Sequence, residues 1–329
     1  MKLIHTVLKQ TTLALVAVCA LGAPTLHAQS KFPEKAVRFI VPFPPGGGND
    51  ILARALQPKL AEALGQPVLI DNRASAGGNL GTDLAAKSPP DGYTIVIASN
   101  QVTMNPYLHA KLPFDIDKDL VPVAQAASVP MVLVVHPSVQ ANNVREFIAL
   151  AKSSPGKLNH ATPGGGTPQH IAFEVLNHAA GINVTHVPYK GTGPAIADLL
   201  GGQVQSAIAT LASVDPHIKA GKLRALGVTT PKRSSAAPNI PTIAESGLPG
   251  FEVPLWYSIL APAGTPRDVL NRLSGDIAKT LQSPDVRDRL VAQGFDVQYL
   301  NPDQMAALMK SDMARWQKTF KDIGSIKVD

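Results

Sequence analysis

Two Gly-Gly-Gly sequences, at residues 46–48 and 164–166, constrain what this chain can fold into more than any other feature. Each follows a short run that is predicted as a strand and precedes a segment with apolar residues at helical spacing. A glycine-rich turn that opens a helix leaves main-chain N–H groups unpaired and directs the positive end of the helix dipole towards a bound anion. One such loop could be an ordinary tight turn. Two loops in similar contexts predict two halves of the chain that close on one shared anion.

Predicted strands alternate with predicted helices along the rest of the chain, which indicates an α/β fold with mainly parallel sheets. In the first half, strands are predicted at residues 37–43, 67–70 and 93–98, with helices between them. Pro58 falls inside the first helix and is expected to kink it or to split it near Gln57. The second half repeats this plan, with strands predicted at residues 158–162, 184–187, 204–210 and 223–228.

Two apolar segments separate these halves and suggest a division into two lobes. Roughly 300 mature residues suggest two domains or one large one. The segments at residues 129–135 and 251–260 are interpreted as two crossings between the lobes. The first lobe is therefore expected to be discontinuous, with residues 29–129 and 251–329, and the second lobe to span residues 130–250.

The amino terminus has the features of a secretory signal peptide, which we place at residues 1–28. Lys2 and Lys9 precede an apolar run at residues 13–21, which is too short to span a membrane. Cys19 leaves a lipoprotein as an alternative, although Val18 is not the small residue that a lipoprotein signal needs. The expected location is the periplasm. Since Cys19 is the only cysteine, the mature chain is expected to contain no disulfide and no catalytic thiol.

The charge of the chain does not favour a nucleic-acid partner. Its formal net charge is +6, and removal of Lys2 and Lys9 leaves 6 − 2 = +4. The basic residues form no block longer than the pair Lys232–Arg233, and few aromatic residues lie beside them. A nucleic-acid-binding face normally needs such clusters, so we expect none here.

Sequence motifs of the common enzyme classes are also missing. The chain has no Gly-x-Ser-x-Gly elbow, no phosphate-binding lysine loop, no His-Glu-x-x-His and no Gly-x-Gly-x-x-Gly fingerprint. His160, His170, His178 and His186 belong to different predicted elements, so a metal site would require their coincidental convergence. We therefore expect no catalytic residues, no metal site and no cofactor, with a secreted α/β enzyme as the less favoured alternative.

Several short sequences occur along the chain from Pro33 to about Phe320 in the order found in one family. They are residues 41–50 (VPFPPGGGND), 71–73 (DNR), 76–81 (AGGNLG), 90–94 (PDGYT), 188–191 (PYKG), 221–226 (GKLRAL), 241–245 (PTIAE) and 261–266 (APAGTP). Taken together they resemble the Bug family, the extracytoplasmic solute receptors of tripartite tricarboxylate transporters. The resemblance implies a two-lobed periplasmic binding protein of the Venus flytrap type, type II-like, with two interdomain crossings. It also implies that two strand–turn–helix loops, helped by ordered water, grip a carboxylate between the lobes.

The same resemblance implies the partners of the protein. These are a small organic carboxylate and the membrane subunits of a tripartite tricarboxylate transporter, and we expect the receptor itself to be a monomer. A periplasmic sensor that presents the bound carboxylate to a signalling partner is an alternative. The sequence leaves open which carboxylate is bound, because loop backbones recognise the shared carboxylate and variable walls distinguish the rest.

The candidate ligand-binding residues lie on the two loops and on three further segments. Neither loop contains Arg or Lys, so an anion there would be held by main-chain N–H groups, hydroxyls and helix dipoles. The candidates are Pro45, Gly46, Gly47, Gly48, Asn49, Gly77, Gly78, Ser99, Asn100, Thr162, Gly164, Gly165, Gly166, Thr167, His170 and Tyr189.

Several of these candidates have an alternative structural role. Thr167 is placed to cap the following helix, and His170 in its first turn could cap or pack instead of contacting ligand. The turn at residues 77–78 could supply donors or only allow close helix packing, and Tyr189 could form the wall of the site. Asp50 is expected to support the N-terminus of its own helix. Pro163, where the family commonly has a small residue, removes one N–H donor from the second loop.

Overall fold

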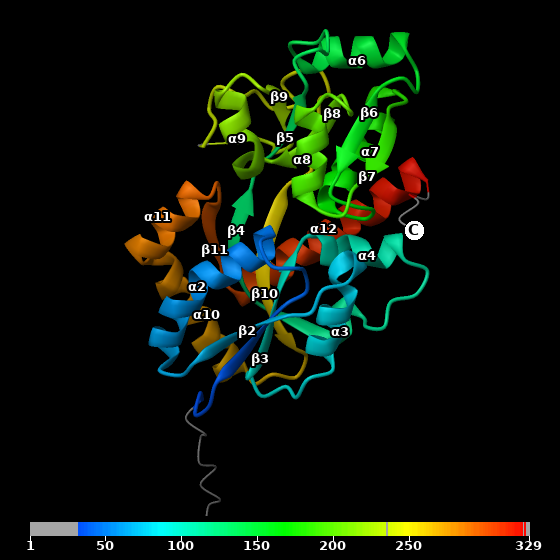
Figure 1. Cartoon of the computed structure of the whole chain (residues 1–329). Coiled ribbons are helices and arrows are strands. Elements are labelled where there is room, and N and C mark those ends of the chain that lie inside the picture. The colour runs from blue at the N-terminus through cyan, green and yellow to red at the C-terminus, as the bar shows by residue number, and fades with distance from the viewer. Residues whose placement is uncertain (1–31, 235, 325, 327–329) are drawn as a thin grey trace, which may run out of the picture.

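The computed structural model describes residues 32–234, 236–324 and 326. The predicted signal peptide, residues 1–28, lies outside this part. The described chain forms two α/β lobes, each built around one β-sheet and connected by two crossings (Figure 1). No helix in these residues is both long and apolar enough to span a bilayer.

The sheet of the first lobe has six strands in the order β11-β4-β10-β3-β1-β2. Strands β1 and β2 and strands β1 and β3 are parallel, whereas β10 runs antiparallel to both β3 and β4, and β11 antiparallel to β4. The expectation of a mainly parallel sheet is therefore wrong for this lobe, because the chain returns from the second lobe through β10 in the opposite direction. The strands are β1 (Val37–Val41), β2 (Val68–Asn72), β3 (Thr94–Ser99), β4 (Leu120–Val129), β10 (Leu255–Pro262) and β11 (Asp296–Leu300).

Helices of the first lobe come from both ends of the described chain. Helix α2 continues through Pro58 and is not split near Gln57, and Leu52, Leu56 and Leu60 on one of its faces are all fully buried. A kink at Pro58, the other expected effect, stays a prediction. The helices are α2 (Gly48–Leu64), the short 3-10 helix η1 (Ala76–Gly78), α3 (Asn79–Ala86), α4 (Gln101–Leu108), α5 (Ile116–Asp119), α10 (Arg267–Gln282), α11 (Pro284–Ala292) and α12 (Pro302–Ile323).

The sheet of the second lobe has five strands in the order β7-β6-β8-β5-β9. Strand β6 is parallel to β7 and β8, while β5 is antiparallel to β8 and β9, so this sheet is also mixed. Its strands are β5 (Met131–Val135), β6 (Asn159–Thr162), β7 (Thr185–Pro188), β8 (Ser206–Thr210) and β9 (Arg224–Val228). Its helices are α6 (Val144–Ser153), α7 (Pro168–Ala180), α8 (Thr192–Leu200) and α9 (Leu211–Lys219).

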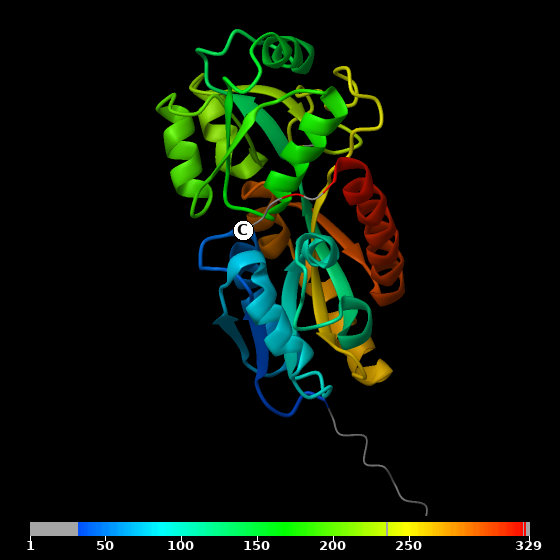
Figure 2. The ribbon, with the colours of Figure 1, turned by 90° about the vertical axis from the view of Figure 1, so that its right-hand side faces the viewer.

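The strand registers place the carboxyl ends of the parallel strands of each sheet on the side nearest the other lobe. In the first sheet, Ser99 at the end of β3 pairs with Tyr257, and Leu255 pairs with Val129, after which the chain leaves for the second lobe. In the second sheet, Met131 pairs with Thr210 at the end of β8. Strand β6 is parallel to β8, so its following loop has the same orientation. The loops after β1 and β6 are therefore on the facing sides of the two lobes, as two perpendicular views show (Figures 1 and 2).

Candidate ligand-binding site

The first glycine loop is held in place by a buried carboxylate. Asp50 is only 3 % exposed, and its side chain accepts hydrogen bonds from the N–H of Gly46, from Arg54 Nε and from Asn72 Nδ2, each at 2.9 Å. Burial by itself would raise the pKa of Asp50, but the hydrogen bonds from Arg54, Asn72 and Gly46 together lower it. Asp50 therefore works as a charged support for the loop and for the first turn of α2, as expected from its position.

Helix α2 begins at Gly48 with its first N–H groups unpaired. The N-cap residue, Gly47, has no side chain that could accept from them, so the N–H groups of Gly48, Asn49 and Asp50 lack an intrahelical acceptor. The Oδ1 atom of Asn49 is buried and also has no hydrogen-bond partner among the described residues. Gly48 additionally packs against the hydroxyl of Tyr257, which a Cβ at this position would strike.

The turn at Gly77 and Gly78 has a clear packing role. Both residues adopt a positive φ, of 65° and 68°, which glycine tolerates best. A Cβ on Gly78 would lie 2.9 Å from the ring of Phe43, so the turn can approach the first loop only because it lacks side chains. Close packing, one of the two roles foreseen for this turn, is therefore observed. Its use as a source of N–H donors stays a prediction.

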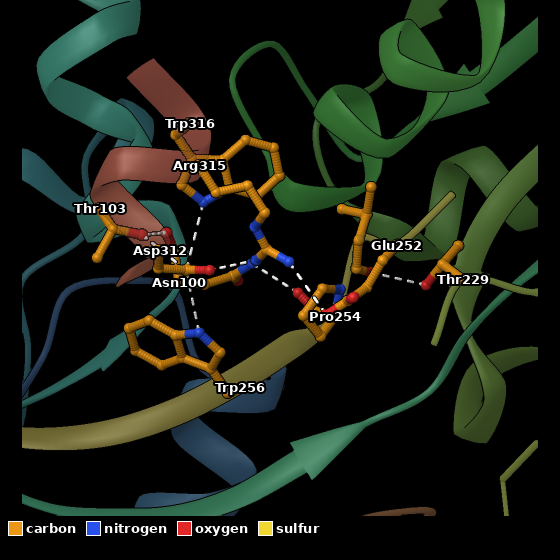
Figure 3. Close-up of polar contacts among 10 residues, drawn as sticks. Asn100, Thr103, Thr229, Glu252, Pro254, Trp256, Asp312, Arg315 and Trp316 are labelled. Carbon is orange, nitrogen blue, oxygen red and sulfur yellow. Dashed lines mark hydrogen bonds and ion pairs between the residues drawn. The ribbon is translucent and has the colours of Figure 1, made fainter. Parts of the chain in front are cut away.

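Ser99 and Asn100 lie at the carboxyl end of β3 and are both buried. Ser99 Oγ accepts from the N–H of Gln101 at 3.4 Å. Asn100 uses its side-chain amide elsewhere, because its Nδ2 donates to the carbonyl of Pro254 at 2.7 Å (Figure 3). Its Oδ1 is buried without a partner in the described part of the chain. Contact between these two residues and a ligand stays a prediction.

Thr167 stabilises the second loop through hydrogen bonds to residues on both sides of it. The Thr167 hydroxyl donates to the carbonyl of Gly164 at 2.8 Å and accepts from the N–H of His170 at 3.3 Å. Pro168, which needs no hydrogen-bond acceptor, occupies the first position of α7. Thr167 therefore caps α7, one of its two foreseen roles.

His170 faces the interior of the second lobe. It is 1 % exposed, its Nδ1 accepts from the N–H of Gly166 at 3.1 Å, and its Nε2 lies 3.4 Å from Glu174 Oε1. The N–H of Gly166 is therefore already paired, whereas those of Gly165 and Thr167 have no acceptor within the described chain. Direct contact of His170 with ligand stays a prediction, but its visible role is to hold the loop.

His186 and His160 support this loop, although neither is among the candidate ligand-binding residues. Thr162 Oγ1 lies 2.6 Å from His186 Nε2, and the ring of His186 stacks on that of His170 with 3.9 Å between centroids. His160 stacks on Phe173 at 3.7 Å, and its Nε2 accepts from the N–H of Ile208. His160 and His186 are paired in register across β6 and β7, a contact that no local sequence pattern indicates.

Burial disfavours the charged form of His186 and of His160. It lowers the pKa of His186 to about 4, with a further contribution from His170, and lowers the pKa of the fully buried His160 well below its ordinary value. Of the four histidines whose convergence the sequence left as a coincidence, His170 and His186 do meet, but their rings stack on each other, while His160 stacks on Phe173. In the described residues, no group of three or more His, Cys, Asp or Glu side chains is arranged to hold a metal ion.

Tyr189 lies in the neighbouring loop, between β7 and α8. Its hydroxyl donates to Asp198 at 2.7 Å, and burial together with this carboxylate raises the pKa of Tyr189 to about 12. Its N–H donates to the carbonyl of Thr162, and the N–H of Gly191 donates to that of Pro163, both at 2.9 Å. The loops after β6 and β7 therefore form one connected edge, although a ligand contact by Tyr189 stays a prediction.

A cavity of about 750 Å³ lies elsewhere, at the β9 and β11 edges of the sheets, between residues 230–234 and the segment from α10 to β11. It includes none of the predicted site residues. A much smaller hollow is lined by Gly77, Gly78 and Ser99. The larger cavity is lined by Lys232, Arg233 and Arg287, which could also attract an anion. We favour the loop edges as the ligand site, because unpaired main-chain N–H groups lie there at the start of a helix.

The edges of the two lobes thus offer hydrogen-bond donors and positive helix ends, without a basic side chain on either glycine loop. Such an arrangement suits a small anion whose charge is satisfied by main-chain N–H groups. We interpret it as a binding site for a carboxylate, since the one loop hydroxyl described beside an imidazole, that of Thr162 at 2.6 Å from His186 Nε2, belongs to a fully buried residue.

Comparison with known proteins agrees with this geometry. The family model described as the tripartite tricarboxylate transporter family receptor matches residues 52–325. Protein BugT of Bordetella pertussis is 36% identical over 312 residues, which cover 94% of this chain and 95% of BugT.

Two solved structures of related proteins contain a bound carboxylate. Rpa4515 of R. palustris, solved with adipate, is 34% identical with a TM-score of 0.82, and the match covers 89% of this chain and 98% of that one. MatC of Rhodopseudomonas palustris, solved with malate, is 33% identical with a TM-score of 0.79, covering 88% and 99%. The chain therefore belongs to the Bug-type family of tripartite tricarboxylate transporter receptors, which are periplasmic solute-binding proteins.

Proposed function

We propose that this protein is a periplasmic receptor that binds one small organic carboxylate between its lobes and delivers it to the membrane subunits of a tripartite tricarboxylate transporter. The observation that carries the proposal is the position of the two glycine loops. They follow parallel strands of two different sheets and lie on the facing sides of the two lobes. Adipate and malate in the related Rpa4515 and MatC support a carboxylate as the ligand class.

In this proposal the carboxylate oxygens accept from the unpaired N–H groups at the start of α2 and from the second loop. Asp50 and Arg54 fix the first loop, and Thr167 and His170 fix the second, so the donors are preorganised before the ligand arrives. We further propose that residues 1–28 direct secretion and are removed, and that the receptor acts as a monomer without catalysis.

A thermal-shift screen of organic acids, followed by calorimetry, tests this function. Adipate and malate belong in the panel, with neutral sugars and organic cations as comparison compounds. A true ligand at one hundred times its dissociation constant should add about 2.7 kcal/mol to stability, and calorimetry should show one molecule bound per chain. Shifts with sugars or cations alone would contradict the proposal. Consumption of the carboxylate in the same samples would indicate an enzyme instead.

A further inference from the structure

The second crossing between the lobes changes its hydrogen-bond partners within one peptide unit (Figure 3). Val253 is held by the second lobe, because its N–H donates to the carbonyl of Thr229 at 2.9 Å and its carbonyl accepts from Thr229 Oγ1 at 2.8 Å. Thr229 directly follows β9. The next residue, Pro254, is held by the first lobe, since its carbonyl accepts from Asn100 at the end of β3. The chain therefore passes from one lobe to the other between Val253 and Pro254.

The first crossing changes lobes at a proline as well. Val129 pairs with Leu255 in the first sheet, and Met131 pairs with Thr210 in the second, which leaves Pro130 between them. Hinges are usually a few residues at the ends of elements, where the backbone can rotate without breaking a sheet. Pro130 and Pro254 mark the two points about which these lobes can rotate.

The guanidinium of Arg315 is fixed to the first lobe beside the second crossing, at Pro254 (the pivot). Asp312, which is 3 % exposed, forms an ion pair with Arg315. The same carboxylate accepts from Trp256 Nε1 at 3.1 Å, from Trp316 Nε1 at 3.3 Å and from Thr103 Oγ1 at 3.1 Å (Figure 3). These contacts come from β10, α12 and α4, all in the first lobe, and they give Arg315 a defined position before it meets any further partner.

That further partner is Glu252, on the other side of the pivot. Arg315 donates through one of its terminal nitrogens to Glu252 Oε1 at 3.1 Å. Glu252 precedes Val253 and so moves with the second lobe. Of the ion pairs between described residues, this is the only one that joins groups held by different lobes.

We propose that Arg315 and Glu252 form a latch across the hinge that stabilises the lobe arrangement described here and sets the balance between open and closed receptor. The inference rests on the proposed function, because it names what regulates the closing of that binding site. A partly exposed ion pair stabilises modestly, so its loss should change the ratio of the two arrangements by about twofold to fivefold.

The lobe separation of the unliganded protein gives the most direct test. Spin labels on cysteines in place of Lys87 and Lys219, which are exposed residues in different lobes, report this distance. The labelling is specific in the mature chain, because Cys19, the only cysteine of the sequence, lies in the proposed signal peptide. Glu252→Gln should change the distance distribution measured by pulsed electron resonance. Glu252→Lys should change it further, because it places a like charge opposite Arg315. Since Glu252 is partly exposed, both variants should fold, which circular dichroism can verify.

A matched control is Asp303→Asn, which makes the same change of charge in an ion pair that lies within the first lobe. Asp303 accepts two hydrogen bonds from Arg267, and its loss should leave the lobe separation as in the wild type. A Glu252→Gln distribution equal to those of the wild type and of Asp303→Asn would overturn the latch. These distances need no ligand, so a failure of the latch is distinguishable from a failure of carboxylate binding.

Discussion

At the scale of single residues, Gly47 offers a sharp test of the anion site because it is the N-cap of α2. Its φ of −81° and ψ of 167° suit an aspartate, which is a favourable N-cap residue. In Gly47→Asp the new carboxylate would occupy the N–H groups that we assign to the ligand and repel its charge. Carboxylate affinity should fall at least tenfold, about 1.4 kcal/mol, while stability changes by less than about 0.5 kcal/mol. Calorimetry and thermal unfolding measure the two effects.

Gly165→Asp should lower affinity in the same way if both loops share one ligand. Unlike Gly164 and Gly166, Gly165 does not have a positive φ, so the substitution does not force the backbone into a strained region. The control is Ser283→Asp, which puts an aspartate at the N-cap of α11, away from both loops. Normal binding by both loop variants would mean that the glycine turns are structural and that the ligand lies elsewhere.

His186 should make the second lobe sensitive to acid. Its pKa of about 4 lies below the ordinary value of 6.5, because burial and the neighbouring His170 disfavour the charged ring. The unfolded chain therefore binds a proton at a higher pH than the folded one, and the free energy of unfolding should fall as the pH falls from 6.5 to about 4. Denaturant unfolding across this interval measures the slope.

His186→Asn should reduce that slope without removing it, since His160 is buried and shifts in the same direction. Glu174 opposes the effect slightly, because its charge favours protonated His186. A slope equal to that of the wild type would show that His186 is not one of the responsible groups.

At the scale of elements, the start of α2 depends on its contact with β10. Alanine normally stabilises a helix relative to glycine, but a Cβ on Gly48 would strike the hydroxyl of the buried Tyr257. Gly48→Ala should therefore lower the free energy of unfolding by about 1–3 kcal/mol, as overpacked sites do. Tyr257→Phe removes the obstructing oxygen and should restore part of this loss in the double variant, measured in a double-mutant cycle. Simple additivity of the two changes would contradict this explanation.

At the scale of the whole molecule, ligand binding should close the lobes about the two crossings. Each glycine loop belongs to a different lobe, so one ligand can contact both loops fully only when the lobes approach each other. Small-angle scattering should show a smaller radius of gyration with saturating carboxylate than without it. Identical profiles would count against closure, and addition of a neutral sugar serves as the control.

The sequence by itself determined the local structure of the loops and the family. A glycine run between a strand pattern and a helical pattern predicts a strand–turn–helix, because the tight turn depends on the local backbone alone. The order of motifs such as residues 41–50 and 188–191 identified a Bug-type receptor. Thr167 as the cap of α7 and Asp50 as a support of α2 could also be predicted, since both act within one helical turn.

Features that depend on contacts between distant segments of the chain could be found only in the tertiary structure. The reversal of β10, the stacked rings of His170 and His186, and the contact of Gly48 with Tyr257 follow from strand register and packing, which no local pattern encodes. The same holds for Asn100, whose amide binds the crossing at Pro254, and for the latch between Arg315 and Glu252. Local preferences act over a few residues, whereas these contacts join elements that are far apart in the chain and meet only when both lobes have folded.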